Sequence, residues 1–302
     1  MIFVFDIGGT MTKYGIYENS EMCYELIEHN EFPSMANQGG RIMIDHLFKA
    51  VEELSINYNL TGISISSAGQ IHPFSGEVIF ATDNIPGYSG MNLKKMFESR
   101  FAVPVAVEND VNCFLLGEYS TRNLSGDVLG LTLGTGIGGA VMTRGELLRG
   151  STFSAGEIGH IQLVREGLPC TCGYNGCFEQ YASTKALKTR VELEMSIDDL
   201  KIFFQRCKEN DSAALSLLDQ WIDDLTDGIK SLIHVLNPEK VIIGGAIAAQ
   251  GAYLEAAIEK KLKQKIMSSF AKELQIIVSE NGNTNNLNGA LVHWIQSYPN
   301  MS

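Results

Sequence analysis

The sequence predicts an α/β protein built from two similar halves, and three observations support this fold class. Short apolar runs typical of buried strands alternate with stretches whose apolar residues recur at helical spacing. Several predicted strands end in polar or glycine-rich segments, which is where open α/β sheets bind their ligands. The succession of strand, glycine-rich hairpin and strand also occurs twice, within residues 2–17 and again within residues 128–142.

Composition and charge exclude several classes of protein. The chain has 302 residues, of which 45% are hydrophobic and 19% charged, so it can form a buried core in two ordinary domains. A formal net charge of −12 argues against binding nucleic acid through a broad basic surface. No apolar run is long enough to cross a bilayer, and no basic region precedes an apolar one at the amino terminus. We therefore expect a cytoplasmic protein with neither a membrane nor a nucleic-acid partner.

The apolar run at 103–107 predicts a buried strand that ends in Glu108-Asn109-Asp110. At the carboxyl end of such a strand, Asp110 could act as a general base for a hydroxyl group, and Asn109 could hold that hydroxyl in place. The alternative is a helix N-cap, because Asn and Asp favour that position and an apolar stretch follows. Taken alone, the three residues favour the cap; the motifs described next favour the base.

A glycine-rich hairpin is predicted close to the amino terminus. A short strand leads into Asp-Ile-Gly-Gly-Thr at 6–10, and a returning strand is expected at 14–17. The pair Gly8-Gly9 is typical of a primed hairpin turn. Two glycines, a hydroxyl and Lys13 would let backbone N–H groups approach a phosphate closely. A plain hairpin with no ligand explains this segment equally well.

A second hairpin repeats the first. The predicted strand at 128–133 is followed by Gly-Thr-Gly-Ile-Gly-Gly at 134–139 and a returning strand at 140–142. It differs from the dinucleotide fingerprint, because a strand rather than a helix follows the glycines. Two such hairpins suggest two halves of one design that grip a polyphosphate from both sides. A third glycine turn, Gly244-Gly245, follows the strand at 241–243.

Four residues form a candidate metal site. One imidazole and three thiols make a Cys₃His set typical of closed, tetrahedral structural zinc: His160, Cys170, Cys172 and Cys177. In the absence of a secretory signal, clustered cysteines indicate metal rather than disulfides. The alternative is three free thiols on a loop, with the histidine unrelated to them. The remaining cysteines are expected to be buried: Cys23, Cys113 and Cys207.

The remaining pattern is regular. Helices are expected at 41–54, 92–101, 111–119, 184–195, 198–207, 213–236, 251–263 and 285–294. Further strands are expected at 61–66 and 275–278, and a loop rich in turn formers at 83–88.

In this order, these motifs resemble the ROK family (repressors, open reading frames and kinases), sugar kinases of the actin-like ATPase, or ribonuclease H-like, fold. The resemblance covers essentially the whole chain. Residues 6–10 and 134–139 are similar to the family's two phosphate motifs, and Gly244-Gly245 is similar to its adenosine motif. The stretch 157–179 is similar to its signature region and zinc module, and it is the most specific of these matches.

The resemblance implies two α/β lobes with a central cleft and a zinc knuckle. The first lobe would span 1–115, and the C-terminal helix at 287–302 could complete it. The second lobe would span 116–286 and contain the zinc module at 157–179. The family is commonly dimeric, so a homodimer is expected.

The resemblance also implies ATP-dependent phosphorylation of a hexose, normally at the 6-hydroxyl, with Asp110 as the general base and with ATP, Mg²⁺ and structural Zn²⁺ as cofactors. The positions that match the family's sugar contacts are Gly69, Gln70, Thr82, Asn84, Asn109, Asp110, Glu157, His160 and Glu179. Those assigned to the nucleotide are Asp6, Gly8, Gly9, Thr10, Thr12, Lys13, Gly134, Thr135, Gly136, Gly138, Gly244 and Gly245. His160 would bind zinc through one ring nitrogen and a sugar hydroxyl through the other.

The resemblance does not identify the sugar. Tyr88 stands where many relatives carry Trp, and Gln70 where some carry Arg, so the sugar's identity is in doubt. Glucose is the first expectation; N-acetylmannosamine, N-acetylglucosamine, fructose and a β-glucoside are alternatives. A sugar-responsive DNA-binding repressor would need a helix-turn-helix domain, yet only five residues precede Asp6. A sugar sensor without activity is disfavoured, since the base, both hairpins and the metal set are intact.

Overall fold

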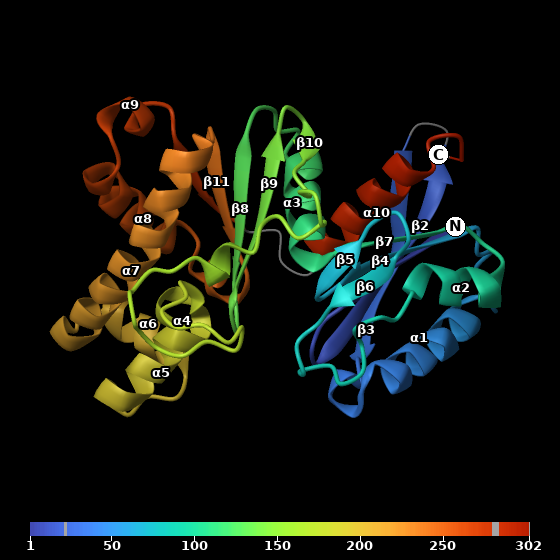
Figure 1. The fold of residues 1–302 in the computed structure, drawn as a ribbon, viewed down its shortest axis with the longest axis horizontal. Coiled ribbons are helices and arrows are strands. Elements are labelled where there is room, and N and C mark those ends of the chain that lie inside the picture. The colour runs from blue at the N-terminus through green and yellow to red at the C-terminus, as the bar shows by residue number, and fades with distance from the viewer. Residues whose placement is uncertain (21–22, 280–283, 302) are drawn as a thin grey trace. The chain divides into compact units, whose positions relative to one another are not determined.

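The computed structural model describes residues 1–20, 23–279 and 284–301. The chain divides into two compact units, each an α/β structure around a five-stranded sheet (Figure 1). The first unit comprises Met1–Ser125, Arg149–Ala155 and Asn281–Ser302, and the second comprises Gly126–Leu148 and Gly156–Glu280. The boundary expected near residue 115 falls inside a helix, and the units divide after Ser125 instead.

The first unit contains a sheet with both parallel and antiparallel strands, and helices cover both of its faces. Its main strands are β1 (Ile2–Ile7), β2 (Met11–Ser20), β3 (Cys23–Pro33), β4 (Gly62–Ser67) and β7 (Val105–Asn109). Its helices are α1 (Gly40–Leu54), α2 (Leu93–Phe101), α3 (Asp110–Thr121) and α10 (Asn285–Ser297), with the short η1 (Ala36–Gln38). The strand order is β3-β2-β1-β4-β7, and β5 (Gln70–His72) and β6 (Glu77–Phe80) form a separate two-stranded ribbon.

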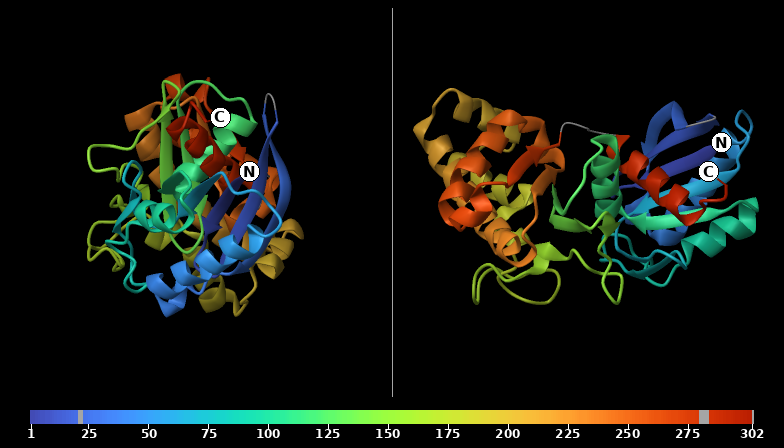
Figure 2. Two further views of the ribbon diagram at one scale, coloured as in Figure 1. Left: turned by 90° about the vertical axis from the view of Figure 1, so that its right-hand side faces the viewer. Right: turned by 90° about the horizontal axis from the view of Figure 1, so that it is seen from above.

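Alternating side chains on β1 explain why both faces of this sheet are covered. Phe3 and Phe5 belong to a core that includes α1 and α2, whereas Ile2 and Val4 belong to a core that includes α3 and α10. α3 and α10 approach each other closely through a glycine, because a Cβ on Gly289 would lie 1.7 Å from the Cys113 carbonyl oxygen. The helix that begins at Asp110 is therefore fixed against the C-terminal helix of the same unit (Figure 2).

The second unit is built around a sheet of order β10-β9-β8-β11-β12. Its strands are β8 (Val128–Leu133), β9 (Ile137–Thr143), β10 (Glu146–Leu147), β11 (Lys240–Gly244) and β12 (Gln275–Val278). Its helices are α4 (Glu179–Ala182), α5 (Thr184–Met195), α6 (Leu200–Lys208), α7 (Ser212–Leu236), α8 (Ala252–Lys265) and α9 (Ser268–Ala271), with the short η2 (Ile158–His160) and η3 (Ala246–Gln250).

The two sheets share one plan. In each unit an antiparallel hairpin, β1–β2 or β8–β9, has its first strand paired in parallel with a later strand, β4 or β11. This repeat agrees with the two similar halves that the sequence predicts. α7 is the longest helix, and it ends where Asn237 adopts a left-handed conformation just before Pro238, as the sequence indicates.

Three features of the described residues differ from or add to the expectations. β3 was not predicted, because this long strand is mostly solvent-exposed and lacks a continuous apolar face. Cys23 was expected to be buried but is exposed on β3, whereas Cys113 and Cys207 are buried. Among the described residues, no helix combines the length and apolar character needed to span a bilayer.

Candidate functional site

The junction of β7 and α3 positions Asp110. Asn109 caps the helix, since its Oδ1 accepts hydrogen bonds from the backbone N–H groups of Val111 (2.9 Å) and Asn112 (3.1 Å). Its Nδ2 donates to the Gly69 carbonyl (2.9 Å) and to Oδ1 of Asp110 (3.0 Å). The cap alternative is therefore correct for Asn109, and the cap itself orients the neighbouring carboxylate.

The pKa of Asp110 lies near neutral pH. Burial, and next the negative charge of Asp6, raise the pKa of Asp110 to about 7. Hydrogen bonds from Asn109 and from the Val111 N–H act in the opposite direction. A carboxylate with a pKa close to the working pH can both accept and release a proton, which is the property of a general base.

Asp6 lies near Asp110 at the end of β1. Its Oδ1 accepts hydrogen bonds from Ser66 Oγ (2.6 Å) on β4 and from Asn286 Nδ2 (3.1 Å) on α10. Burial raises the pKa of Asp6 in spite of these bonds and of the nearby Lys13. Sequence reasoning missed both partners. The negative charge of Asp6 raises the pKa of Asp110, and two neighbouring carboxylates form a site where a divalent cation would be stabilised.

The predicted primed turn at Gly8-Gly9 is wrong. Neither glycine has the positive φ that such a turn requires, and the Gly8 N–H instead donates to the Met11 carbonyl (3.0 Å), which places the tip of the loop at Gly9-Thr10. A Cβ on Gly8 would lie 2.8 Å from that carbonyl oxygen, so no side chain fits there. Nothing lies within 4 Å of a Cβ placed on Gly9, and its backbone is therefore open to a ligand. Thr12 is buried within β2.

An ion pair with a buried carboxylate supports the same junction of β7 and α3. Glu108 is 1% exposed, and its Oε2 accepts from Arg149 Nε (2.9 Å). Its Oε1 accepts from the Asn109 N–H (2.9 Å) and from Asn112 Nδ2 (3.0 Å). Sequence reasoning gave Glu108 no role, because its partner lies 41 residues away along the chain. The pair fixes the backbone of the residue that orients Asp110.

The other sugar positions expected in the first unit differ in how closely they approach this junction. Gly69 is in contact with Asn109 and has a φ of +98°, which suits glycine. Gln70 begins β5 and pairs with Phe80. Thr82 and Asn84 are exposed in the loop after β6. Tyr88 is fully buried and shares a 2.7 Å hydrogen bond with Ser67, so it acts as a core residue rather than a freely exposed contact.

The second unit brings the second glycine hairpin against Glu179. A Cβ on Gly136 would lie 2.3 Å from Glu179 Oε2, and the Ile137 N–H points to the same oxygen at 3.4 Å. Gly138 follows in β9, and Thr135 is exposed at the tip of the hairpin. The third glycine turn also meets this hairpin.

Gly245 makes that third contact. It has a φ of +90°, and a Cβ there would lie 2.2 Å from the Leu133 carbonyl oxygen. Gly244 is the last residue of β11, and Gly134 follows Leu133 directly. The unit thus gathers both of its glycine turns and Glu179, although the sequence assigned the glycines and the glutamate to different ligands.

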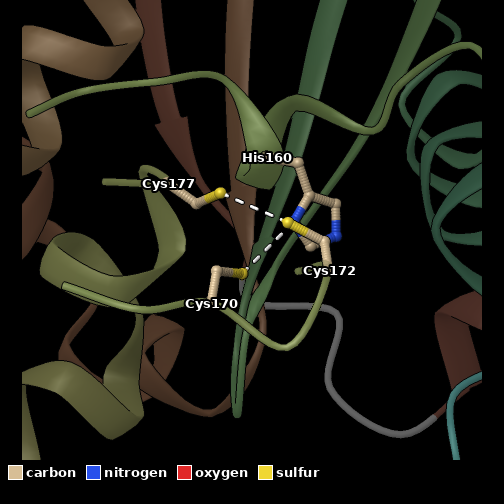
Figure 3. Close-up of side chains that lie close together, drawn as sticks. All are labelled: His160, Cys170, Cys172 and Cys177. Atoms are coloured by element: carbon tan, nitrogen blue, oxygen red, sulfur yellow. Dashed lines mark hydrogen bonds between the residues drawn. The ribbon is translucent and has the colours of Figure 1, made fainter. Parts of the chain in front are cut away.

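The four predicted metal ligands come together in the same unit (Figure 3). Their ligand atoms all lie within 4.8 Å of one another: His160, Cys170, Cys172 and Cys177. Cys170 Sγ lies 3.6 Å from His160 Nδ1, and Cys172 Sγ lies 3.5 Å from Cys177 Sγ. Tetrahedral zinc with ordinary bond lengths places its ligand atoms about 3.6–3.8 Å apart. The donor set therefore fits a closed, four-coordinate zinc ion.

The metal set is joined to the rest of the site through two acids. Cys170 Sγ lies 3.2 Å from Glu179 Oε1, while the other oxygen of Glu179 faces the glycine hairpin. His160 directs Nδ1 toward the thiols and has Nε2 at 3.9 Å from Glu157 Oε2. The side chains of His160 and Glu157 are 36% and 49% exposed. One imidazole nitrogen thus faces the metal set and the other faces an acid that solvent can reach.

The chain is similar to known proteins over almost its whole length, and the description "ROK family" matches residues 3–297. The glucokinase of Thermotoga maritima is 30% identical over 291 residues, which cover 91% of this chain and 90% of that protein. The β-glucoside kinase of Listeria innocua is 30% identical over 307 residues, 98% and 97% of the two chains.

A solved structure shows the same fold. The ROK family glucokinase from Streptomyces griseus, in complex with glucose and AMPPNP, superimposes with a TM-score of 0.80 at 27% identity, covering 96% of this chain and 97% of that one. Its bound nucleotide analogue and sugar are those of a sugar kinase. With a match that runs from residue 3 to residue 297 and with relatives this similar, the chain belongs to the ROK family.

Proposed function

We propose that this protein is an ATP-dependent hexose kinase in which Asp110 is the general base. The observation that supports this most directly is the carboxylate at the start of α3, oriented by Asn109 and with a pKa raised to about 7. In the reaction, the hydroxyl oxygen of the sugar attacks the γ-phosphorus of ATP, its proton passes to Asp110, and ADP leaves. We assign the attack to the 6-hydroxyl by analogy with the glucokinase relatives.

The nucleotide would be bound by the glycine hairpins, and Mg²⁺ would neutralise charge on its phosphates. Asp6 is the residue that would hold the Mg²⁺ ion, because its carboxylate is buried near Asp110 and a cation there would offset the repulsion between the two. The open backbone at Gly9 and the hairpin beside Glu179 would contact the phosphates. The further proposed nucleotide contacts are Gly8, Thr10, Thr12, Lys13, Gly134, Thr135, Gly136, Gly138, Gly244 and Gly245.

The sugar would be held by hydrogen bonds from the positions that the sequence predicts. In the first unit we propose Gly69, Gln70, Thr82, Asn84 and Asn109. In the second we propose Glu157, His160 and Glu179, with the zinc ion fixing the ring of His160 so that Nε2 can bind a hydroxyl. Zinc bound by four protein ligands has no open position, so we assign it a structural role.

Glucose is the substrate that we propose, because glucokinases are among the most similar relatives. A β-glucoside is the second candidate, since a β-glucoside kinase is equally similar and covers more of the chain. The two candidates differ in whether the site must accept a second group on carbon 1 of the sugar.

The test is ADP release from ATP and Mg²⁺ on a panel of sugars. The panel should contain glucose, fructose, mannose, N-acetylglucosamine, N-acetylmannosamine and a β-linked disaccharide. We expect one sugar to give the highest kcat/KM, and phosphate on carbon 6 of the product by NMR. If no sugar is phosphorylated while one still raises the melting temperature, the protein binds sugar without being a kinase.

The raised pKa of Asp110 predicts a specific pH dependence. The base must be ionised to accept a proton, so kcat/KM should fall about tenfold per pH unit below about pH 7 and be level above it. The measurement is kcat/KM for the best sugar from about pH 5.5 to 8.5 at constant ionic strength, with circular dichroism at each pH to show that the fold is retained. A flat profile over this range would exclude Asp110 as a base with a raised pKa.

A further inference from the structure

A pocket of about 320 Å³ lies in the first unit, where α2, α10 and the β5–β6 turn meet the edge strand β7. Its walls include apolar groups from Phe74, Val105 and Ala106. The charged side chains that line it are Lys94 and Arg149, and no Asp or Glu is among the described lining residues. The described lining therefore combines two cationic side chains with several apolar groups.

His293 lines this pocket with an imidazole ring that lacks hydrogen-bond partners among the described residues. The residue is 5% exposed, and neither ring nitrogen has a hydrogen-bond partner among the described residues. Glu108 Oε2 is 3.9 Å from Nδ1, too far for a hydrogen bond. Burial lowers the pKa of His293, although the Glu108 carboxylate and the Val107 carbonyl favour the protonated ring without making a hydrogen bond to it. An imidazole buried without partners is costly, so a ligand that pairs with it would be stabilised.

The two cations retain capacity to bind a ligand. Lys94 makes long polar contacts within the unit, 4.0 Å to Glu98 and 3.4 Å to the Phe74 carbonyl, and its Nζ lies 5.5 Å from the centre of the Tyr298 ring. The two bonds from Arg149 to Glu108 use part of the five N–H donors that a guanidinium offers. Ammonium, guanidinium and imidazole together match a carboxylate or phosphate group, while the apolar wall accommodates a short carbon skeleton.

We propose that this pocket binds a small organic anion, with its carboxylate or phosphate group held by Lys94, Arg149 and His293. The inference uses none of the residues assigned to the sugar or the nucleotide, although Arg149 also pairs with Glu108 beside Asn109. The two anion classes share this chemistry, and separate probes distinguish them.

The experiment follows the ring nitrogens of His293 by NMR during titration of the intact protein. Acetate, methyl phosphate and inorganic phosphate are added at pH 7, with chloride at matched ionic strength as the reference. The chain has six histidines, and a His293→Asn variant assigns the signal of interest. We expect a saturable change at His293 with methyl phosphate, acetate or both, and whichever saturates names the class of anion.

Paired variants separate this site from general ionic effects. Lys94→Gln should weaken the apparent affinity at least about tenfold, since it removes one charged hydrogen-bond donor. Lys95→Gln removes the same charge from the adjacent, exposed residue of α2, which does not line the pocket, and should change the affinity less than about twofold. A signal of His293 that no probe shifts, or that shifts equally in both variants and without saturation, would overturn the proposal.

Discussion

Replacing Asp110 by Asn is expected to lower kcat by about 10²–10⁴-fold, the usual effect of removing a general base. The change is nearly isosteric, and the oxygen that accepts from Asn109 and from the Val111 N–H can remain in place. The helix cap should therefore persist, and with it the sugar site. We expect the dissociation constant of the sugar to change little while turnover is lost.

The same variant makes a prediction about stability whose sign is opposite to that of a simple structural defect. The pKa of Asp110 is raised from its ordinary value of 3.8 to about 7 in the folded protein. Between these two pH values the carboxyl group ionises more readily in the unfolded chain, so the free energy of unfolding falls as the pH rises toward about 7. The Asn variant lacks that cost. Above about pH 7 its melting temperature should equal or exceed that of the unmodified protein.

The measurements are ADP release, sugar binding by calorimetry and thermal unfolding at about pH 8. Asp198→Asn is the matched control, because it makes the same chemical change at an exposed position of the second unit. The control should retain full activity. Near-normal turnover by Asp110→Asn would exclude Asp110 as the base, and a loss of sugar binding together with a lower melting temperature would indicate a structural role instead.

The sequence predicted the position of Asp110 at the end of a buried strand, because strand, amide and acid are adjacent in the chain. A buried strand that runs directly into a helix cap places these residues at the edge of a sheet by local geometry alone. The metal ligands could also be predicted from the sequence, since three cysteines within eight residues cluster in almost any compact loop. Both predictions depended on neighbours in sequence.

What the sequence did not predict depends on contacts between distant segments. Asn286 reaches Asp6 from α10, and Arg149 reaches Glu108 from a separate part of the first unit. No periodicity or motif marks either partner, because only the folded sheet brings them together. The turn predicted at Gly8 was wrong for a related reason. Gly8 lacks a side chain because the Met11 carbonyl leaves no room for a Cβ, and not because the backbone has a positive φ. Composition alone cannot distinguish these two requirements.

Glu179 shows how the structure joins sites that the sequence treated separately. One carboxylate oxygen lies 3.2 Å from Cys170 Sγ, and the other is 3.4 Å from the Ile137 N–H of the glycine hairpin. The metal set, a proposed sugar contact and a proposed phosphate loop therefore share one side chain. Loss of the metal should therefore alter the conformation of the glycine hairpin as well as that of His160.

Loss of zinc is accordingly the second change with a large expected effect. We expect protein purified without added zinc to contain one zinc ion per chain, and Cys172→Ser to lose most of it. An ion bound at about 100 times its dissociation constant stabilises the folded state by roughly 3 kcal/mol, which in a protein of this size corresponds to a fall of about 5 °C in melting temperature. The apparent KM values for both sugar and ATP should rise, because Glu179 contacts both regions.

Metal analysis and thermal unfolding test this prediction without relying on activity. Cys23→Ser is the matched control, since Cys23 is exposed on β3 in the first unit and lies outside the metal set. It should keep its zinc and its melting temperature. A strong chelator should reproduce the effect of Cys172→Ser in the unmodified protein, and added Zn²⁺ should reverse it there but not in the variant. Protein that contains no metal as purified, with equal melting temperatures for the two serine variants, would show that the four side chains cluster without binding zinc.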